Sequence, residues 1–572
     1  MIQTPVAKSP RTLIALVGVV LIVVSVLLVP LSLILSTTYS DWWGVPSDET
    51  VNVQKYWPLT DNNSITFSYL PVTHAPAARI LPSSFGVMTD RVYVAAGPRL
   101  YALDPTNGAP AWPSQGFIDF ADSWYNDTLP TISVDPLVVN FGETVRQTGV
   151  NYWIYVATAS GNVYGLNDSS LQPSQFLPAV VKIGTMDGPA TGLVAYSGDF
   201  DSPFTPYDMV AASSSRGTIY FWQVNETGHH LAGIFRLGTE PIHMAGQPMR
   251  GISPYPLFSP SFYYAWPNMT RPYLYVGSED GNLSAIDISD LSNPRVKWKT
   301  RVLTTATSWT SAPVAHDVNA VDVIDVVVFA ATDDSNLWAL YANNGTPLPR
   351  GGGPVRIGRS PDRLDGGRFT QPLLDQNGDY LYVGSSSGYA YSVAYAPSGT
   401  WAGLVHVKWF FRDFFHAEGS TYVAAPLATY GGTIVFVASN YDRGQPGPSP
   451  EDRGTLFALH IDSGTRSWYK SFESPILGSA LTLTSRNTGN REVVFGTYSG
   501  SVYAFDTSGL LEYGPSLTCP DGNQVARGYL CTKESIPVLL LTPALLTVGV
   551  IMIVYGMAKG MRIGGARGQR PQ

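Results

Sequence analysis

Short segments in which apolar and polar residues alternate recur along this chain, and they come in pairs. In each pair, a run that ends in Ala, Gly or Val leads through a polar turn, usually with Gly, into a second run rich in aromatic residues. Examples are VYVAAGPRLYAL from Val92 and LYVGSEDGNLSAI from Leu274. Short alternating runs predict half-buried strands, and two such runs joined by a Gly-containing turn predict a β-hairpin.

Eight such hairpins occur between Val92 and Phe505, at a mean spacing of about 57 residues. A fixed period in this range, with strands and no helices, predicts a propeller. Short apolar stretches before most copies, such as TSAPVA and VAAPLA, suit an innermost strand. After several copies comes an expected outermost strand whose final aromatic packs between blades. The equivalent core positions are Val94, Val156, Val210, Val276, Phe329, Val383, Val437 and Phe495, and the expected outer strands are Asp104 to Trp112, Asp287 to Trp298 and His460 to Tyr469.

The fold class that follows is all-β, an eight-bladed β-propeller of four-stranded antiparallel blades over residues 62–515. Such a ring has to close, because a linear array of blades would leave free strand edges. We expect Ser64 to Val72, SITFSYLPV, to close it as an outer strand of the blade built around Val493 to Phe505.

Two uncharged apolar segments, Leu13 to Leu35 and Ile536 to Met557, predict one N-terminal and one C-terminal transmembrane helix that flank the propeller. A cleaved signal peptide is the alternative for the first and a buried core helix for the second. The expected parts are a cytoplasmic tail (1–12), a transmembrane helix (13–36), a juxtamembrane linker (37–61), the propeller (62–515), a juxtamembrane loop (516–535), a transmembrane helix (536–557) and a basic cytoplasmic tail (558–572).

The charges beside these segments predict the orientation. Lys8 and Arg11 precede the first, four cationic residues follow the second, and the stretch after Leu35 is acidic with Trp42 and Trp43. Positive flanks mark the cytoplasmic side, so we expect a cell-membrane protein with both termini cytoplasmic and the propeller outside.

An exterior location permits two modifications. Cys519 and Cys531, the only cysteines, lie in the expected juxtamembrane loop, where we predict a disulfide; two free thiols are the alternative. Asn-x-Ser/Thr sequons predict a glycoprotein, although a chain of this composition carries several by chance. The sequons begin at Asn62, Asn126, Asn167, Asn225, Asn268, Asn282 and Asn344.

Composition and net charge limit the class of partner that the chain can bind. The formal net charge is −8, with no basic stripe inside the repeats, which argues against a nucleic-acid partner because binding phosphate needs a basic face. Only 14% of residues are charged and 32 are Tyr, a composition that favours an archaeal surface protein.

One repeat carries a known pattern. The stretch from Ala102 through Asp104 and Gly108 to Trp112 resembles the A-x-D-x-x-x-G-x-x-x-W docking motif of PQQ-type propeller repeats. The stretch from Ala458 through Gly464 to Trp468 is similar, with His460 in place of Asp. The chain therefore resembles the eight-bladed quinoprotein alcohol dehydrogenase-like superfamily over nearly all of residues 62–515.

That superfamily includes dehydrogenases and non-catalytic scaffolds, such as a lipoprotein that helps to assemble outer-membrane barrels. The resemblance implies that a dehydrogenase would place its quinone over adjacent disulfide-bonded cysteines, above a calcium or lanthanide ion. This propeller has no Cys, so PQQ is disfavoured, no cofactor is expected, and a non-catalytic member is favoured. We expect a membrane-anchored scaffold or binding subunit with membrane or envelope protein partners. The alternatives are a membrane-tethered oxidoreductase using PQQ or a metal, and a surface receptor or adhesin.

Two acidic stretches resemble the calcium loops of FG-GAP propeller repeats, which place oxygen ligands at alternate positions. We predict calcium ligands there, with a solvated turn before a buried strand as the favoured alternative. A copper site at His229, His230, His243 and Met244 is weighed against incidental surface histidines, which are favoured. The candidate calcium ligands are Asp317, Asn319 and Asp325 in one stretch, and Asp375, Asn377 and Asp379 in the other.

Overall fold

The computed structural model describes most of the chain between residues 54 and 506. The described ranges are 54–57, 65–66, 70–83, 86–105, 108–113, 116–141, 152–169, 177–196, 208–225, 228–239, 242–243, 273–302, 311–320, 323–332, 335–348, 355–360, 363–365, 367–374, 380–396, 403–413, 421–425, 427–430, 434–442, 452–484 and 491–506.

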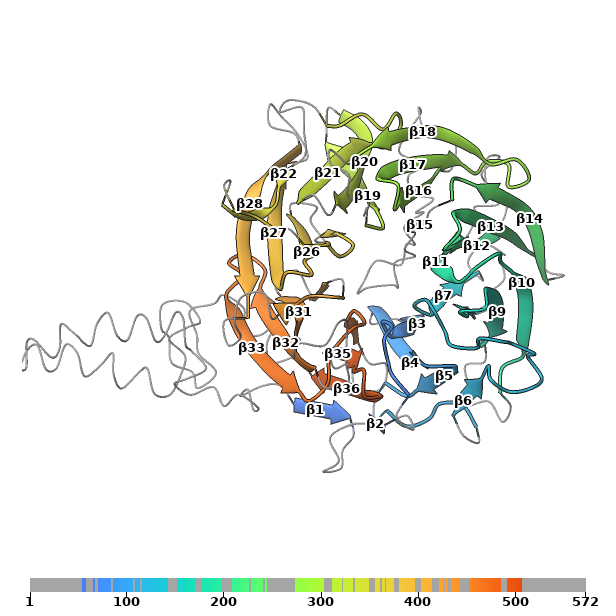
Figure 1. The fold of residues 1–572 in the computed structure, drawn as a ribbon. Coiled ribbons are helices and arrows are strands. Elements are labelled where there is room, and N and C mark those ends of the chain that lie inside the picture. The colour runs from blue at the N-terminus through green and yellow to red at the C-terminus, as the bar shows by residue number, and fades with distance from the viewer. Residues whose placement is uncertain are drawn as a thin grey trace, which may run out of the picture. The chain divides into compact units, whose positions relative to one another are not determined.

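Eight antiparallel sheets of four or five strands make up these residues and follow one another around a ring (Figure 1). We number these blades in chain order. Blade 1 is β3 (Ala77–Ser83), β4 (Gly86–Ala96), β5 (Arg99–Leu103) and β6 (Phe117–Asp119); blade 2 is β7 (Leu137–Asn140), β8 (Tyr152–Ala157), β9 (Asn162–Asn167) and β10 (Val180–Thr185); blade 3 is β11 (Ala190–Tyr196), β12 (Asp208–Ser214), β13 (Thr218–Asn225) and β14 (Gly228–Arg236); blade 4 is β15 (Ile242–His243), β16 (Tyr273–Ser278), β17 (Asn282–Asp287) and β18 (Arg295–Arg301).

The second half of the ring repeats this order, with the first strand of each blade near the centre and the last at the rim (Figure 1). Blade 5 is β19 (Val314–Ala320), β20 (Val323–Thr332), β21 (Asn336–Tyr341) and β22 (Val355–Arg356), followed by a small sheet of β23 (Gly358–Ser360) and β24 (Arg363–Leu364); blade 6 is β25 (Leu373–Leu374), β26 (Tyr380–Gly384), β27 (Tyr389–Ala396) and β28 (Gly403–Arg412); blade 7 is β29 (Thr421–Tyr422), β30 (Ala428–Tyr430), β31 (Ile434–Tyr441), β32 (Arg453–His460) and β33 (Arg466–Phe472); blade 8 is β34 (Leu481–Thr484), β35 (Arg491–Gly496) and β36 (Ser501–Asp506), completed by β1 (Gln54–Trp57) and β2 (Ile65–Thr66).

The predicted eight-bladed all-β fold is confirmed, and so is the ring closure at blade 8. Ile65 pairs with Val502 and Thr66 with Ser501, within the segment expected to close the ring. A further strand, β1, pairs with the same β36 and lies in the segment expected to be a linker. The N-terminal chain therefore supplies the rim of the last blade and leaves the ring no open end at this point.

Both predicted transmembrane segments, with Cys519 and Cys531 between the ring and the second of them, lie outside the described residues. Among the residues that are described, no helix is long and apolar enough to cross a membrane.

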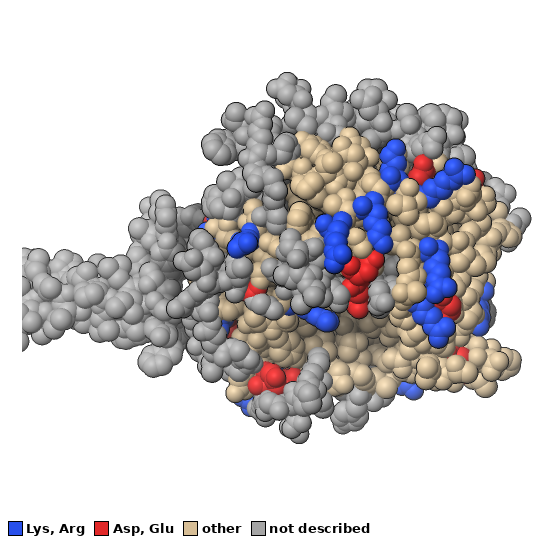
Figure 2. All heavy atoms as spheres, turned by 45° about the horizontal axis from the view of Figure 1, so that its top comes forward, with Lys and Arg blue, Asp and Glu red and all other residues tan. Residues whose placement is uncertain are grey.

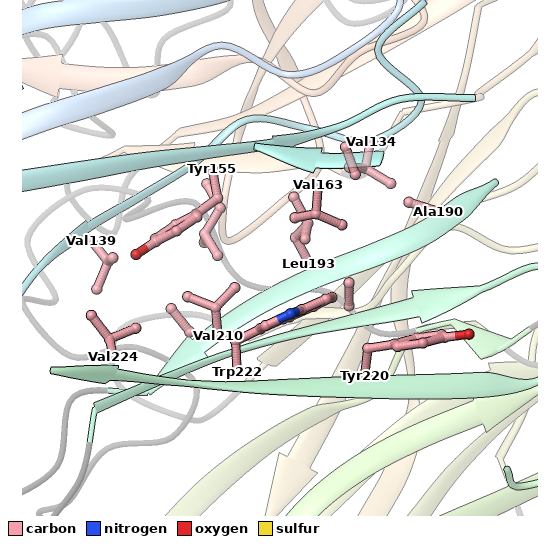
Figure 3. Close-up of a cluster of buried hydrophobic side chains, with 14 of the residues drawn as sticks. Val134, Val139, Tyr155, Val163, Ala190, Leu193, Val210, Tyr220, Trp222 and Val224 are labelled. Atoms are coloured by element: carbon pink, nitrogen blue, oxygen red, sulfur yellow. The ribbon is translucent and has the colours of Figure 1, made fainter. Parts of the chain in front are cut away.

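Each pair of neighbouring blades shares its own hydrophobic core, so eight separate cores run around the ring. Figure 3 shows the one between blades 2 and 3, where Tyr155 and Val163 of blade 2 face Leu193 and Trp222 of blade 3. Another core joins blade 8 to blade 1 and includes Val502. Since alternate residues of a strand point to opposite faces, the two middle strands of each blade serve two cores at once. This explains why the middle strands are apolar almost throughout.

Candidate interaction site

Tryptophans of the rim strands, and the glycine of one docking motif, lie where neighbouring blades meet. The indole N–H of Trp298 in blade 4 donates to the carbonyl oxygen of Ala342 in blade 5 over 2.7 Å. Trp409 in blade 6 donates in the same way to Ile461 in blade 7, over 2.9 Å. A Cβ at Gly464 would lie 2.6 Å from the Trp409 ring, so the Gly of the motif receives the Trp of the preceding blade. Trp298, the aromatic residue of a predicted outer strand, thus packs between blades as expected, and Trp409 on β28 makes the same contact at a second junction.

In blade 1 the predicted outer strand from Asp104 to Trp112 is wrong. The rim strand is β6, and the Gly108 N–H donates to the Asp104 carbonyl over 2.8 Å instead of to a neighbouring strand. Pro105 and Pro110 lack the amide hydrogen that a strand ladder needs, and Gly108 has a positive φ of 69°. Of the remaining docking residues, Ala102, Trp112 and Ala458 are buried, while the side chain of Trp468 lies outside the described residues.

Trp112 donates its hydrogen bond to a buried carboxylate, whereas Trp298 and Trp409 donate theirs to backbone carbonyl groups. Its indole N–H donates to Asp168 Oδ2 over 3.0 Å, and the Tyr93 hydroxyl donates to the same oxygen over 2.7 Å. Arg91 Nη1 forms an ion pair with Asp168 Oδ1, and Arg79 Nη1 lies 3.8 Å from that oxygen. Asp168 thus joins blade 2 to three strands or turns of blade 1.

Two positive and two negative side chains balance in this cluster, since Arg79 also binds Asp90 through Nε over 2.9 Å. Burial alone would lower the pKa of Arg79, but the hydrogen bond to Asp90 and the nearby negative charges outweigh it and raise the pKa. Burial, then the charge of Asp168, raises the pKa of Tyr93 well above its usual value. Arg79 therefore stays charged and Tyr93 stays neutral, and the role of the cluster is to hold two blades together.

The candidate calcium ligands of the first stretch lie in a β-hairpin. Asp317 and Asn319 are in β19 and Asp325 is in β20, where Val318 pairs with Asp325. Their side chains, and the whole second stretch with Asp375, Asn377 and Asp379, lie outside the described residues. Within the described part of the chain, no three His, Cys, Asp or Glu side chains come close enough to hold one metal ion.

The described sequons lie at strand ends and turns. Four of their asparagines are exposed and Asn282 is partly exposed, while Asn62 and Asn268 lie outside the described residues. The side-chain oxygens of Asn167 and Asn344 accept hydrogen bonds from the Ser or Thr two residues later. Glycosylation stays a prediction at these positions. The exposed asparagines are Asn126, Asn167, Asn225 and Asn344.

A loop with a different surface joins β6 of blade 1 to β7 of blade 2. We call residues 120–136 the Trp124 loop. Its first amide, of Phe120, donates to Pro98 in blade 1, and Ile132 donates to Gly97. On the other side, Ser133 donates to Ala157 in blade 2 over 2.9 Å. Backbone hydrogen bonds to both blades fix the two ends of the loop.

Asp127 fixes the middle of the Trp124 loop to blade 2. The Asp127 carboxylate accepts hydrogen bonds from the hydroxyl groups of Thr158, over 2.8 Å, and Tyr164, over 3.0 Å, in the turn and strand of blade 2. It also accepts a hydrogen bond from the backbone N–H of Leu129 over 3.1 Å. Burial alone would raise the pKa of Asp127, but hydrogen bonds from Ser160, Asn162, Thr158 and Tyr164 outweigh it and lower the pKa. The carboxylate is therefore ionised at neutral pH and holds the loop on blade 2.

Aromatic packing supports the same segment. The Phe120 ring lies 5.3 Å from Tyr125 and 4.8 Å from Tyr164, centroid to centroid. Asn126, directly after Tyr125, has a left-handed φ of 46°, which an Asn tolerates better than most residues. With Tyr125 turned inward, the residue before it is turned away from the blade.

That residue is Trp124, whose side chain is 91% exposed. Leu129 on the same loop is 59% exposed. A large aromatic side chain held in solvent by a firmly bonded loop is a typical anchor for a protein partner, because it buries much area on binding and loses little conformational freedom. Residues 117–136 carry four Asp and no Lys or Arg, so the anchor sits in an acidic surrounding. Of these, Asp119 is paired with Arg99 over 2.7 Å, while Asp122 is exposed.

The anchoring carboxylate recurs in other blades. In blade 3, Asp187 accepts from the Thr218 hydroxyl over 2.8 Å, and its amide donates to the Tyr220 hydroxyl. In blade 6, Asp365 accepts from Ser385 and Tyr391 over 2.8 and 2.7 Å. Carboxylates before the hairpin turns are thus a general device of this ring, and only the Trp124 loop combines one with such an exposed aromatic among the described residues.

Sequence patterns did not single out Trp124, Asp127 or Asp168. Strand alternation identifies buried positions, whereas these residues lie in connections between strands. A Trp between Asp residues in FADSWYNDTL interrupts the alternating pattern, and this feature of the sequence could have pointed to the loop.

A model of the LVIVD repeat matches residues 272–302, which include the last three strands of blade 4. No curated protein matches the chain. Among solved structures, Sqt1 of Saccharomyces cerevisiae is similar with a TM-score of 0.49 and 13% identity, over 78% of this chain and 99% of that one. The quinohemoprotein alcohol dehydrogenase of Comamonas testosteroni has a TM-score of 0.47 and 12% identity, over 80% and 76%. BamB of Moraxella catarrhalis has a TM-score of 0.43 and 14% identity, over 80% and 98%.

These similarities concern the fold alone. Function has to be argued from this chain's own surface.

Proposed function

We propose that this chain is a membrane-anchored, extracytoplasmic scaffold that binds a membrane or cell-envelope protein through the Trp124 loop. The observation that carries the proposal is the 91% exposed Trp124 on a loop whose neighbours are fixed by Asp127 and by the Phe120, Tyr125 and Tyr164 rings. A prearranged anchor loses little entropy on binding, so most of its buried area contributes to affinity.

The partner's chemistry follows from the loop. Trp124 and Leu129 require an apolar pocket, and the exposed Asp122 beside Trp124 favours a Lys or Arg at the rim of that pocket. Anchoring rests on the two uncharged apolar segments and on their flanking charges. Both segments connect to blade 8, because β1 and β36 are neighbours there.

Affinity purification of the tagged full-length chain from its native membranes tests the proposal. The wild-type chain is expected to retain a stoichiometric protein partner. Trp124→Ala is expected to weaken binding about thirtyfold, since anchors of this kind contribute about 2 kcal/mol or more. Phe410→Ala removes another exposed aromatic, on β28, and serves as the matched control. Equal recovery of the partner with both variants would rule out the loop as the binding site.

A further inference from the structure

The outer strands of blades 2, 3 and 4 carry most of the exposed apolar side chains. Of the eight large hydrophobic residues that the described part of the chain exposes, five lie on or beside these strands. Leu231 and Ile234 on β14 are 54% and 55% exposed. The other three are Leu177, Val181 and Val296. Apolar groups gathered on one surface mark an interaction site more often than apolar groups scattered singly.

Cations surround them. The outer strand β18 exposes four cationic residues within seven; Lys299 forms an ion pair with Asp280 at 2.9 Å, and Arg295 interacts with the charge of Asp290. Lys182 on β10 and Arg236 on β14 add two more. Figure 2, which brings the top of the ring in Figure 1 forward, where β18 lies, shows Lys and Arg side chains in several groups with fewer Asp and Glu. The chain as a whole is acidic, at −8, so this surface is a local reversal of sign. The cations of β18 are Arg295, Lys297, Lys299 and Arg301.

The three strands are adjacent at the rim (Figure 1). Residues of β10 and β14 contact each other. A Cβ at Gly233 of β14 would lie 1.8 Å from the carbonyl oxygen of Leu291, in the connection that leads to β18. Side chains of the three blades therefore form one surface, which we call the β10–β18 rim.

The edge of β14 is long, unpaired among the described strands and poor in charge. β14 ends the sheet order of blade 3 and runs for nine residues, and no described strand pairs with its outer edge. Proteins blunt exposed edges with charges, as β18 does, because an open edge templates another strand. From Leu231 to Arg236, β14 has a single charged residue and two of the most exposed aliphatic side chains. An edge of this kind favours the addition of a strand.

We propose that the β10–β18 rim binds an extended, acidic segment of a partner protein, which adds as a strand along β14 from Leu231 to Arg236. Alternate apolar side chains of the segment would cover Leu231 and Ile234, and its carboxylates would meet Arg295, Lys297 and Arg301. This surface is separate from the Trp124 loop and does not depend on it. Charge complementarity favours an acidic segment, and the open edge favours an extended one over a helix.

A direct test uses a fluorescent nonapeptide of alternating Glu and Val, measured by anisotropy with the purified full-length chain in neutral detergent. Binding is expected, and it should weaken as salt is raised. Ile234→Lys places a charge on the edge and is expected to weaken binding about tenfold. Phe410→Lys, which places the same charge on the rim strand of blade 6, is the matched control and is expected to leave binding unchanged.

Two further probes separate the alternatives. A peptide N-methylated at alternate residues keeps its charge and cannot complete the strand ladder, so it should not bind. Equal binding of this peptide, or of a Lys–Val peptide, would overturn strand addition. Vesicles of phosphatidylserine test whether the apolar and cationic surface serves an anionic bilayer instead. Binding of vesicles without binding of the Glu–Val peptide would also overturn the proposal.

Discussion

Gln54 pairs with Asp506 in the outermost ladder of blade 8, so the first and last described strands of the ring are direct neighbours. The chain enters and leaves the propeller at one place. Both ends of the chain therefore connect to the same blade.

Paired cysteines test this closure. In a background with Cys519 and Cys531 replaced by Ser, Gln54→Cys with Asp506→Cys is expected to form a disulfide, because antiparallel partners have Cα atoms about 4.5–5.5 Å apart. Closing so long a loop should raise the melting temperature. Gln54→Cys with Ser463→Cys, in blade 7, is the control. Efficient crosslinking of the control pair, or none of the first, would contradict the register of β1.

Gly464 and Trp409 test the docking contact. Gly464 has a φ of 65°, and a Cβ there would lie 2.6 Å from the indole ring. Gly464→Ala is expected to lose about 1 kcal/mol from the backbone and a further 1–3 kcal/mol from the clash. Gly97 has a comparable φ of 56°, and a Cβ there would come no closer than 3.3 Å to the end of the Leu70 side chain, so Gly97→Ala shows mainly the backbone cost. Equal losses in denaturant unfolding would remove the packing role of the motif glycine.

Asp168 tests the charge cluster between blades 1 and 2. Asp168→Asn keeps the shape of the side chain and leaves Arg79 and Arg91 with one carboxylate, Asp90, for two buried positive charges. The expected loss is about 3–5 kcal/mol, the usual cost of breaking a buried pair. Asp122→Asn, on the exposed part of the Trp124 loop, should change stability by less than about 0.5 kcal/mol. Similar unfolding midpoints for both variants would show that Asp168 does not hold the blades.

His229 predicts a dependence of stability on pH. Its Nε2 lies 2.7 Å from the Tyr155 hydroxyl, between blades 3 and 2, and burial followed by the charge of His230 lowers its pKa from 6.5 to about 4. The folded state therefore prefers neutral imidazole. The stability from this contact is complete above about pH 6.5 and falls as the pH drops toward about 4.

Melting temperatures measured from pH 4 to 7 check this prediction. His229→Phe keeps an aromatic ring and should flatten the profile in this interval, while His230→Gln should keep most of the slope. A profile for His229→Phe as steep as that of the wild type would contradict the assignment.

The parts of the structure that follow from strand alternation could be predicted from sequence, and the parts that depend on contacts between blades could not. Val94 and its seven equivalents recur because each middle strand packs on both sides. The number of repeats in the sequence therefore predicts the number of blades. The motif pairs Gly464 with Trp468 in one repeat, whereas the ring that Gly464 receives belongs to Trp409, one blade earlier. No spacing within a repeat shows which blade comes next to a turn.

The candidate site could not be predicted from the sequence either, because it also depends on contacts between segments that are distant in the chain. Asp127 and Tyr164 lie 37 residues apart and meet only after blade 2 has formed. Trp124 resembles a core residue by type, and its exposure depends on Tyr125 occupying the inner position next to Phe120. The prolines of blade 1 were visible in the sequence and could have excluded the outer strand that we predicted there.

The most direct test of the central claim is site-specific photocrosslinking from residue 124 in native membranes, with a photoreactive aromatic amino acid in place of Trp124. The account predicts a crosslink to one membrane or envelope protein, and no such product from the same probe at Phe410. A chain that yields no crosslink from residue 124, and that purifies alone with the absorbance of a bound redox cofactor, would contradict it.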